Sequence, residues 1–148
     1  MTRREAREHC FKMLFCQDFH PAEEKEQQLE WYFDAPVEDV TTKDGLEEVL
    51  HKVDASDADK KYLAEKVEKI MTLIPELDEE LVKVAEGWKT NRMGKVELTI
   101  LRLAVYEMKK DEEIPEKVAI NEAVELAKKF GGDDAPAFVN GILAKMIG

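Results

Sequence analysis

Glycine, proline and cysteine are all scarce in this sequence, whose 148 residues include seven glycines, five prolines and two cysteines. So few helix breakers, with apolar residues spaced three and four apart, indicate helices throughout and require no strand. The two cysteines, Cys10 and Cys16, are six residues apart in what reads as one helix. They are then separated by about 9 Å along the axis and lie on different faces, which excludes an intrachain disulfide.

Long apolar runs and metal-ligand spacings are also missing. No stretch approaches the roughly 20 apolar residues of a membrane-spanning helix, and the charged N-terminus has no apolar signal region. The three histidines have no ligand spacing with the cysteines. No nucleophile–base set and no phosphate-binding loop stand out. The sequence therefore predicts a cytoplasmic protein without membrane contact, which is not an enzyme and needs no metal or cofactor.

Positive charge is scarce overall, and its distribution is uneven. A formal net charge of −11 argues against a nonspecific coat for nucleic acid. The first dozen residues nevertheless hold Arg3, Arg4, Arg7 and Lys12 against only two glutamates. Cations at a helix start oppose the helix dipole by roughly 0.3–1 kcal/mol, so three arginines there need a reason. They are either an ordinary solvated helix start or contacts to phosphate.

Helical periodicity and capping residues divide the first half of the chain. Thr2 and Glu5 are predicted to form a capping box that starts the first helix, each side chain bonding a free backbone N–H. Ser56 or Asp57 caps a later helix, which Pro75 breaks or restarts. Between these helices we predict an end of the first helix at His20-Pro21, a second helix from Ala22 to about Phe33, a polar linker over Thr41–Gly45, and a short helix after Gly45.

The second half contains the most apolar helix of the chain. Residues from Val96 to about Lys109 are apolar nearly all round, which predicts the central and most buried helix. A further helix runs from Val118 to Phe130 and is closed by Gly131 at the position after its end.

The prediction for the end of the chain depends on the sequence FVNGIL at residues 138–143, where a hairpin and a helix compete. Asn-Gly between apolar pairs is a strong hairpin signal. Here the apolar residues follow the spacing of one helical face, so helix is favoured. Asp133 or Asp134 offers an N-cap and Pro136 sits in the first turn. Gly141 then allows either tight packing on a neighbouring helix or close approach of a ligand backbone beside Phe138.

Four segments in the same order resemble the NusB family of transcription antitermination factors along nearly the whole chain. These segments are Arg3-Arg4-x-Ala6-Arg7 leading into Leu14-Phe15; Trp88 with Arg92-Met93, Val96-Glu97 and residues 100–108 (ILRLAVYEM); Ile114-Pro115 with residues 118–131 (VAINEAVELAKKFG); and residues 138–143.

The resemblance implies an all-α fold of about seven helices, arranged as two packed helical subdomains. We expect one NusB-like RNA-binding domain over residues 1–148, with subdomains of about 1–74 and 75–148. It also implies a function without catalysis. NusB-like proteins bind the boxA element of nascent RNA together with NusE, a small-subunit ribosomal protein. The pair helps to build an antitermination complex with RNA polymerase and other Nus factors, chiefly on ribosomal RNA operons.

The resemblance also suggests which residues bind. The RNA-binding candidates are Arg3, Arg4, Arg7, Lys12, Phe15 and Phe138, and Glu97 is the candidate contact to NusE. Each has a simpler interpretation: the two phenylalanines could belong to the core, which is favoured for Phe15, and Glu97 could be a first-turn acid stabilised by the helix dipole. The alternative function is a helical protein-binding scaffold without RNA affinity, and the sequence leaves monomer and homodimer equally open.

Overall fold

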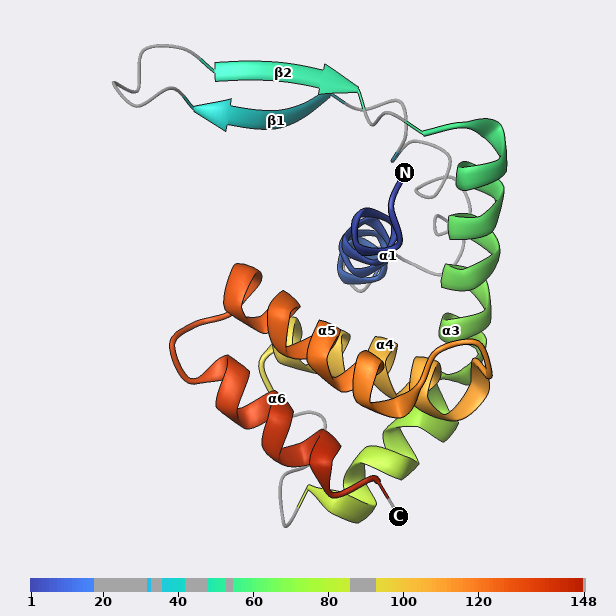
Figure 1. Ribbon diagram of the computed structural model, residues 1–148, viewed down its shortest axis with the longest axis vertical. Coiled ribbons are helices and arrows are strands. Elements are labelled where there is room, and N and C mark those ends of the chain that lie inside the picture. The colour runs from blue at the N-terminus through green and yellow to red at the C-terminus, as the bar shows by residue number, and fades with distance from the viewer. Residues whose placement is uncertain (18–31, 33–35, 42–47, 53–54, 86–92, 148) are drawn as a thin grey trace. The chain divides into compact units, whose positions relative to one another are not determined.

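The computed structural model describes residues 1–17, 32, 36–41, 48–52, 55–85 and 93–147. This part of the chain contains the elements α1 (Arg3–Gln17), β1 (Pro36–Thr41), β2 (Glu48–Lys52), α3 (Asp57–Val84), α4 (Lys95–Lys110), α5 (Glu116–Phe130) and α6 (Ala135–Ala144), drawn in Figure 1. The chain divides into two compact units, Met1–Glu65 and Lys66–Gly148, with the boundary inside α3. The predicted second helix lies outside the described residues, apart from Tyr32, which is helical.

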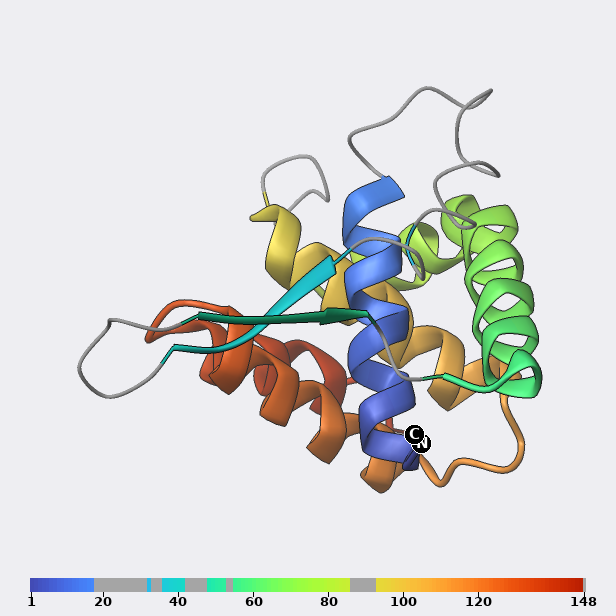
Figure 2. The same ribbon diagram turned by 90° about the horizontal axis from the view of Figure 1, so that it is seen from above.

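Residues 36–41 and 48–52 form a two-stranded antiparallel hairpin, and its second strand stands where a short helix was predicted after Gly45. The predicted polar linker lies outside the described residues, apart from Thr41. β1 pairs with β2 so that Val37 lies opposite His51, and the strands run side by side in Figures 1 and 2. The expectation that no strand is needed is therefore wrong for residues 36–41 and 48–52, whereas the elements in the other described ranges are helices, in agreement with the predicted all-α class. Both strands contain valine, whose branched side chain favours extended backbone. Asp44-Gly45, between the strands, is a dipeptide typical of hairpin turns, and the helical interpretation gave it too little weight.

Helix α3 continues through Pro75, where the sequence predicted a break or a restart. Proline removes one backbone hydrogen bond and crowds the preceding turn, at a cost of about 3 kcal/mol. Ile70 and Leu77, on either side of the proline, are almost completely buried, so packing holds both halves of the helix in place. The Thr72 hydroxyl donates to the Glu68 carbonyl at 2.9 Å, a bond that also favours bending, and α3 changes direction along its length in Figure 1.

The second unit is built around α4, as predicted. Leu101 is fully buried, and α4, α5 and α6 pack against one another (Figure 1). Three ion pairs join α4 to α3, of which the one between Lys110 and Glu76 is exposed and the other two are largely shielded from solvent. The Arg102 guanidinium donates two hydrogen bonds to the Asp78 carboxylate, each 2.9 Å long, and Lys66 Nζ lies 3.6 Å from Glu107 Oε2 in the interior. Bidentate geometry strengthens the Arg102–Asp78 contact. The pairing of Lys66 with Glu107 leaves neither buried charge uncompensated.

Gly131 ends α5, as predicted, but for a different physical reason. Its φ of −96° and ψ of 176° are open to any residue, so the left-handed conformation expected of a closing glycine is not used. A Cβ at this position would instead lie 2.5 Å from Ala135 Cβ and 2.9 Å from the Ala127 carbonyl oxygen. Glycine therefore permits the close approach between the end of α5 and the start of α6.

The start of α6 confirms one predicted feature and corrects another. Residues 138–143 are helical rather than a hairpin, and Pro136 lies in the first turn. Asp134 is the N-cap residue, yet its side chain makes no capping hydrogen bond, because its backbone is already in the helical region. The predicted capping role of this aspartate is therefore wrong.

Candidate nucleic-acid interface

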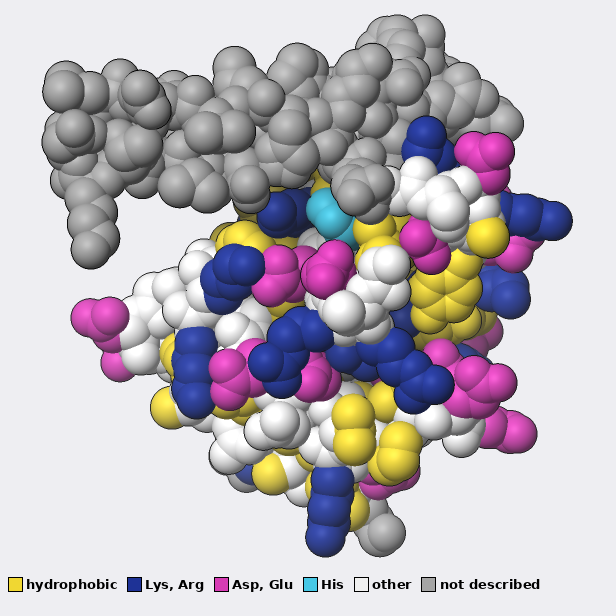
Figure 3. All heavy atoms as spheres, turned by 45° about the horizontal axis from the view of Figure 1, so that its top comes forward, with side chains coloured by type: hydrophobic (Ala, Val, Ile, Leu, Met, Phe, Trp, Pro, Cys, Tyr) yellow, Lys and Arg dark blue, Asp and Glu magenta, His cyan; other side chains and the backbone are white. Residues whose placement is uncertain are grey.

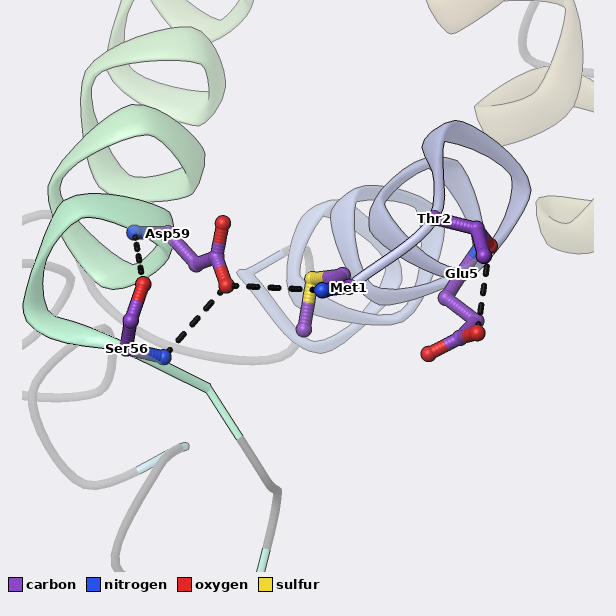
Figure 4. Close-up of polar contacts among 5 residues, drawn as sticks. All are labelled: Met1, Thr2, Glu5, Ser56 and Asp59. Atoms are coloured by element: carbon purple, nitrogen blue, oxygen red, sulfur yellow. Dashed lines mark hydrogen bonds and ion pairs between the residues drawn. The ribbon is translucent and has the colours of Figure 1, made fainter.

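Helix α1 begins with a variant of the predicted capping box (Figure 4). The Glu5 backbone N–H donates to Thr2 Oγ1 at 3.1 Å, as expected of a capping threonine. The Thr2 hydroxyl in turn donates to Glu5 Oε1 at 3.1 Å, where the sequence predicted that this carboxylate would accept from a backbone N–H. Thr2 and Glu5 thus stabilise the first turn that carries Arg3 and Arg4.

A second capping motif at the start of α3 lies against the first residue of the chain (Figure 4). The Asp59 N–H donates to Ser56 Oγ at 3.1 Å, and the Ser56 N–H donates to Asp59 Oδ2 at 3.4 Å, which confirms Ser56 as the cap. The Met1 ammonium lies 3.9 Å from the same Asp59 oxygen. The Asp59 carboxylate therefore links the beginnings of α1 and α3 within the first unit. It helps to fix the position of the first turn of α1, which carries Arg3 and Arg4.

The structure separates the basic residues of α1 by exposure. Arg3 and Arg4 are exposed and Lys12 is half-buried, whereas Arg7 is only 8% exposed. At 100° per residue, Arg7 falls on the half of α1 that carries the buried apolar side chains. Those buried side chains are Cys10, Phe11, Met13 and Leu14. Arg3, Arg4 and Lys12 are thus accessible to an anion, and Arg7 is much less so.

Phe15 lies on the accessible side of α1. Its ring is half-buried and stacks on Phe11, with centroids 6.1 Å apart and an interplanar angle of 30°. On the helical wheel Phe15 falls within about 80° of both Arg4 and Lys12. Phe11 is buried and anchors the stack, so the outer ring is held rigidly where an unpaired base could contact it.

His9 is a polar residue of α1 whose role was not predicted. Its Nδ1 is 2.6 Å from the Tyr32 hydroxyl, and the two rings meet edge to face at 5.8 Å. Burial lowers the pKa of His9, the positive charge of Lys12 lowers it further, and Glu8 and Glu5 act in the opposite sense. The lowered pKa favours the neutral imidazole over the cation. Its partner is 23 residues away, so no local pattern could have revealed this contact.

In the second unit, the surface beside Phe138 is open. Phe138 is half-buried, and Asn140 and Gly141, which follow in α6, are exposed. A Cβ added at Gly141 would meet no heavy atom within 4 Å. Tight packing of Gly141 on a neighbouring helix is therefore wrong for the part of the chain described, and the alternative of close approach by a ligand stays a prediction.

Glu97 has a local role at the start of α4. It is half-buried, and its carboxylate folds back over Gly94, the N-cap residue, into the space that a Cβ there would fill. A carboxylate in this position is stabilised by the N-terminal end of the helix dipole. This geometry agrees with the simpler interpretation of Glu97, and its contact with NusE stays a prediction.

The residues with assigned positions contain no group of three or more side chains able to hold a metal ion. Within the same ranges no helix is long and apolar enough to cross a membrane. Cys10 and Cys16 are both free thiols on α1, as their spacing predicts.

Comparison with known proteins identifies the class to which this helical fold belongs. The sequence model of the NusB family matches residues 4–148. The transcription antitermination protein NusB of Lachnoclostridium phytofermentans is 48% identical over 147 residues, which is 99% of each chain. The chain belongs to the NusB family of transcription antitermination factors, which are not enzymes, and the resemblance seen in its sequence is confirmed.

Solved structures support the same fold. A structure of T. maritima NusB is 30% identical, with a TM-score of 0.77 over 99% of this chain and 90% of that chain. A structure of the antitermination factors NusB and NusE in complex with dsRNA has a TM-score of 0.66 over 99% of this chain and 97% of that chain. It is 24% identical to this chain, so it supports the fold alone.

Proposed function

We propose that this antitermination factor binds boxA RNA of ribosomal RNA operons through the basic start of α1. One observation carries the proposal: Arg3 and Arg4 are exposed on the first turn, although cations are disfavoured there and the whole chain has a net charge of −11. Arginines at such a position are suited to phosphate, which accepts their hydrogen bonds and is attracted by their charge.

Three further residues belong to the proposed set of RNA contacts. Lys12 adds a cation on the accessible side of α1, and Phe15 and Phe138 offer half-exposed rings on which unpaired bases can stack. The open strip at Gly141 lets an RNA backbone come near Phe138. Arg7 supports the helix from beneath more than it contacts phosphate, because so little of it is exposed.

The working form in this proposal is a heterodimer with NusE, which acts with RNA polymerase and other Nus factors in the cytoplasm. The acidic body of the chain repels RNA, and its small basic region is offset by Glu5 and Glu8. A basic ribosomal protein docked on acidic surface, with Glu97 as a candidate contact, would reduce this repulsion. A protein of the same fold, in the NusB–NusE structure with dsRNA, forms an assembly of this kind. The single RNA-binding domain over residues 1–148, with subdomains meeting near residue 74, belongs to the same proposal.

The competing function is a helical scaffold that binds proteins without RNA affinity. Such a scaffold would have no use for two exposed arginines against the dipole at the start of its first helix. The accessible cations therefore favour RNA.

The test is a titration of fluorescent boxA RNA and of a scrambled RNA of the same length, with and without saturating NusE. We expect preference for boxA and a gain in affinity with NusE of roughly 5–150-fold, the usual range of coupling between two ligands. By reciprocity RNA should tighten NusE binding by the same factor. Equal weak binding of both RNAs under all conditions would favour the scaffold. Selective binding that NusE does not change would show that this chain suffices alone.

A further inference from the structure

Glu8 lies in the middle of a row of charged side chains along α1. Arg4, Glu8 and Lys12 are four residues apart on one continuous helix, so their Cβ atoms follow one another at about 5–6 Å on the same side. Arg4 is exposed, and Glu8 and Lys12 are half-buried, so the row borders solvent along its length. In this Arg4–Glu8–Lys12 row, the Glu8 carboxylate is therefore the neighbour of both cations, each one helical turn away.

Glu5, the other acid of this helix, is placed differently. Its backbone N–H and its carboxylate both bond to Thr2, each at 3.1 Å, so Glu5 serves the helix start. Glu8 has no such position at a helix end. Lys12 and Glu8 also shift the pKa of His9 in opposite directions, which places both charges within electrostatic reach of one ring.

From this arrangement we infer that Glu8 is an internal competitor of RNA phosphate for Arg4 and Lys12. The inference rests on the proposed function, because it concerns the same RNA-binding surface. A phosphate that approaches the row must share both cations with a carboxylate already beside them, which lowers the affinity for any RNA backbone. RNA that has only backbone contacts to offer is then held too weakly to compete. RNA that also stacks its bases, or that is held by a partner protein, remains bound.

The first experiment compares Glu8→Gln with Glu65→Gln. Both remove one negative charge from the first unit, but Glu65 lies exposed on α3, outside the row. At low salt we expect Glu8→Gln to tighten binding of boxA and of scrambled RNA by about fivefold. The interaction of two unit charges about 4 Å apart in water changes a binding constant by about this factor. We expect less than a twofold change for Glu65→Gln. For the Glu8→Gln variant, the slope of the logarithm of the RNA-binding constant against the logarithm of the salt concentration should steepen by up to about 0.7 for each phosphate newly contacted.

The second experiment tests whether Glu8 acts through the two cations. In an Arg4→Gln/Lys12→Gln background, the further change Glu8→Gln should no longer tighten binding. Tightening that persists undiminished there would mean that Glu8 repels RNA directly, and the inference would be wrong. Equal effects of Glu8→Gln and Glu65→Gln would also overturn it.

The same variants separate this inference from the proposed function. If Arg4→Gln/Lys12→Gln leaves RNA binding unchanged, α1 is not the interface and the proposed function fails. If that variant weakens binding while Glu8→Gln matches Glu65→Gln, only the inference fails. Circular dichroism checks that α1 is retained, and Glu8→Ala, with the same expected tightening, replaces Glu8→Gln should the latter fail to fold.

Discussion

Helices α1 and α4 use their polar residues in opposite ways. α4 is buried nearly all round, and its charges serve packing: Arg102 binds Asp78, and Glu107 is paired with Lys66 in the interior. α1 buries one half and turns a mixed row of charges to the other. In α4 the sequence pattern predicts the burial of the helix, although not the partners of its charged residues. In α1 the pattern predicts the helix, but it does not distinguish the exposed Arg4 from the buried Arg7.

The largest expected effect lies in α4. Leu101→Ala removes a fully buried side chain, and we expect a loss of about 2–5 kcal/mol in the free energy of unfolding. Chemical denaturation followed by circular dichroism measures it. Val118→Ala is the control, because Val118 is 45% exposed, and it should change stability by less than about 0.5 kcal/mol. Similar losses for both variants would show that α4 is not the centre of the core.

A smaller loss is expected where α5 meets α6. Gly131→Ala places a Cβ against Ala135 Cβ and the Ala127 carbonyl, so overpacking should cost about 1–3 kcal/mol. Gly132→Ala is a matched control, because a Cβ there meets nothing within 4 Å. If denaturation midpoints of the two variants agree, close approach is not the reason for the glycine.

Gly141→Ala should have opposite effects on stability and on binding. The position is helical and open, so alanine should stabilise the fold by about 0.4–1 kcal/mol. If RNA passes close to α6 beside Phe138, the added methyl group should weaken boxA binding at the same time. Thermal melting and RNA titration of one preparation measure both. A stabilised variant with unchanged RNA affinity would remove this strip from the interface.

The smallest effect concerns His9. Its pKa is lowered in the folded state, so the unfolded chain binds more protons near pH 6.5. The contribution of His9 is therefore present above pH 6.5 and is lost as the pH falls through the folded-state pKa. Between pH 7 and 5.5 the parent protein should lose more stability than His9→Asn, which cannot titrate. Parallel stability curves would mean that burial and the charge of Lys12 do not lower the pKa of His9 in the folded protein.

The sequence predicted most of the fold because the apolar spacing of α4, α5 and α6 reports packing directly. It failed where one local signal was weighed against another: the proline in α3 is tolerated because packing on both sides holds the helix, and residues 48–52, which form β2, were assigned to a short helix. The candidate site was predicted in part. Charge and resemblance located the basic turn, but exposure depends on tertiary packing. For this reason the burial of Arg7, the His9–Tyr32 contact and the open surface at Gly141 required the structure.

The face drawn in Figure 3 has charges of both signs on its surface. Basic and acidic side chains are interspersed there, as Figure 3 shows, so no large area of one sign would attract RNA by itself. On this face, attraction of RNA would depend on individual cations and not on a broad basic area.

The most direct test of the account is the salt dependence of boxA binding by Arg3→Gln/Arg4→Gln, measured in the presence of NusE. Loss of two phosphate contacts to a single strand should make the slope of the logarithm of the binding constant against the logarithm of the salt concentration shallower by about 1.4. Lys61→Gln/Lys117→Gln removes the same charge from exposed positions outside α1 and should leave the slope nearly unchanged. An unchanged slope in the arginine variant, or an equal change in both variants, would contradict phosphate binding at the start of α1.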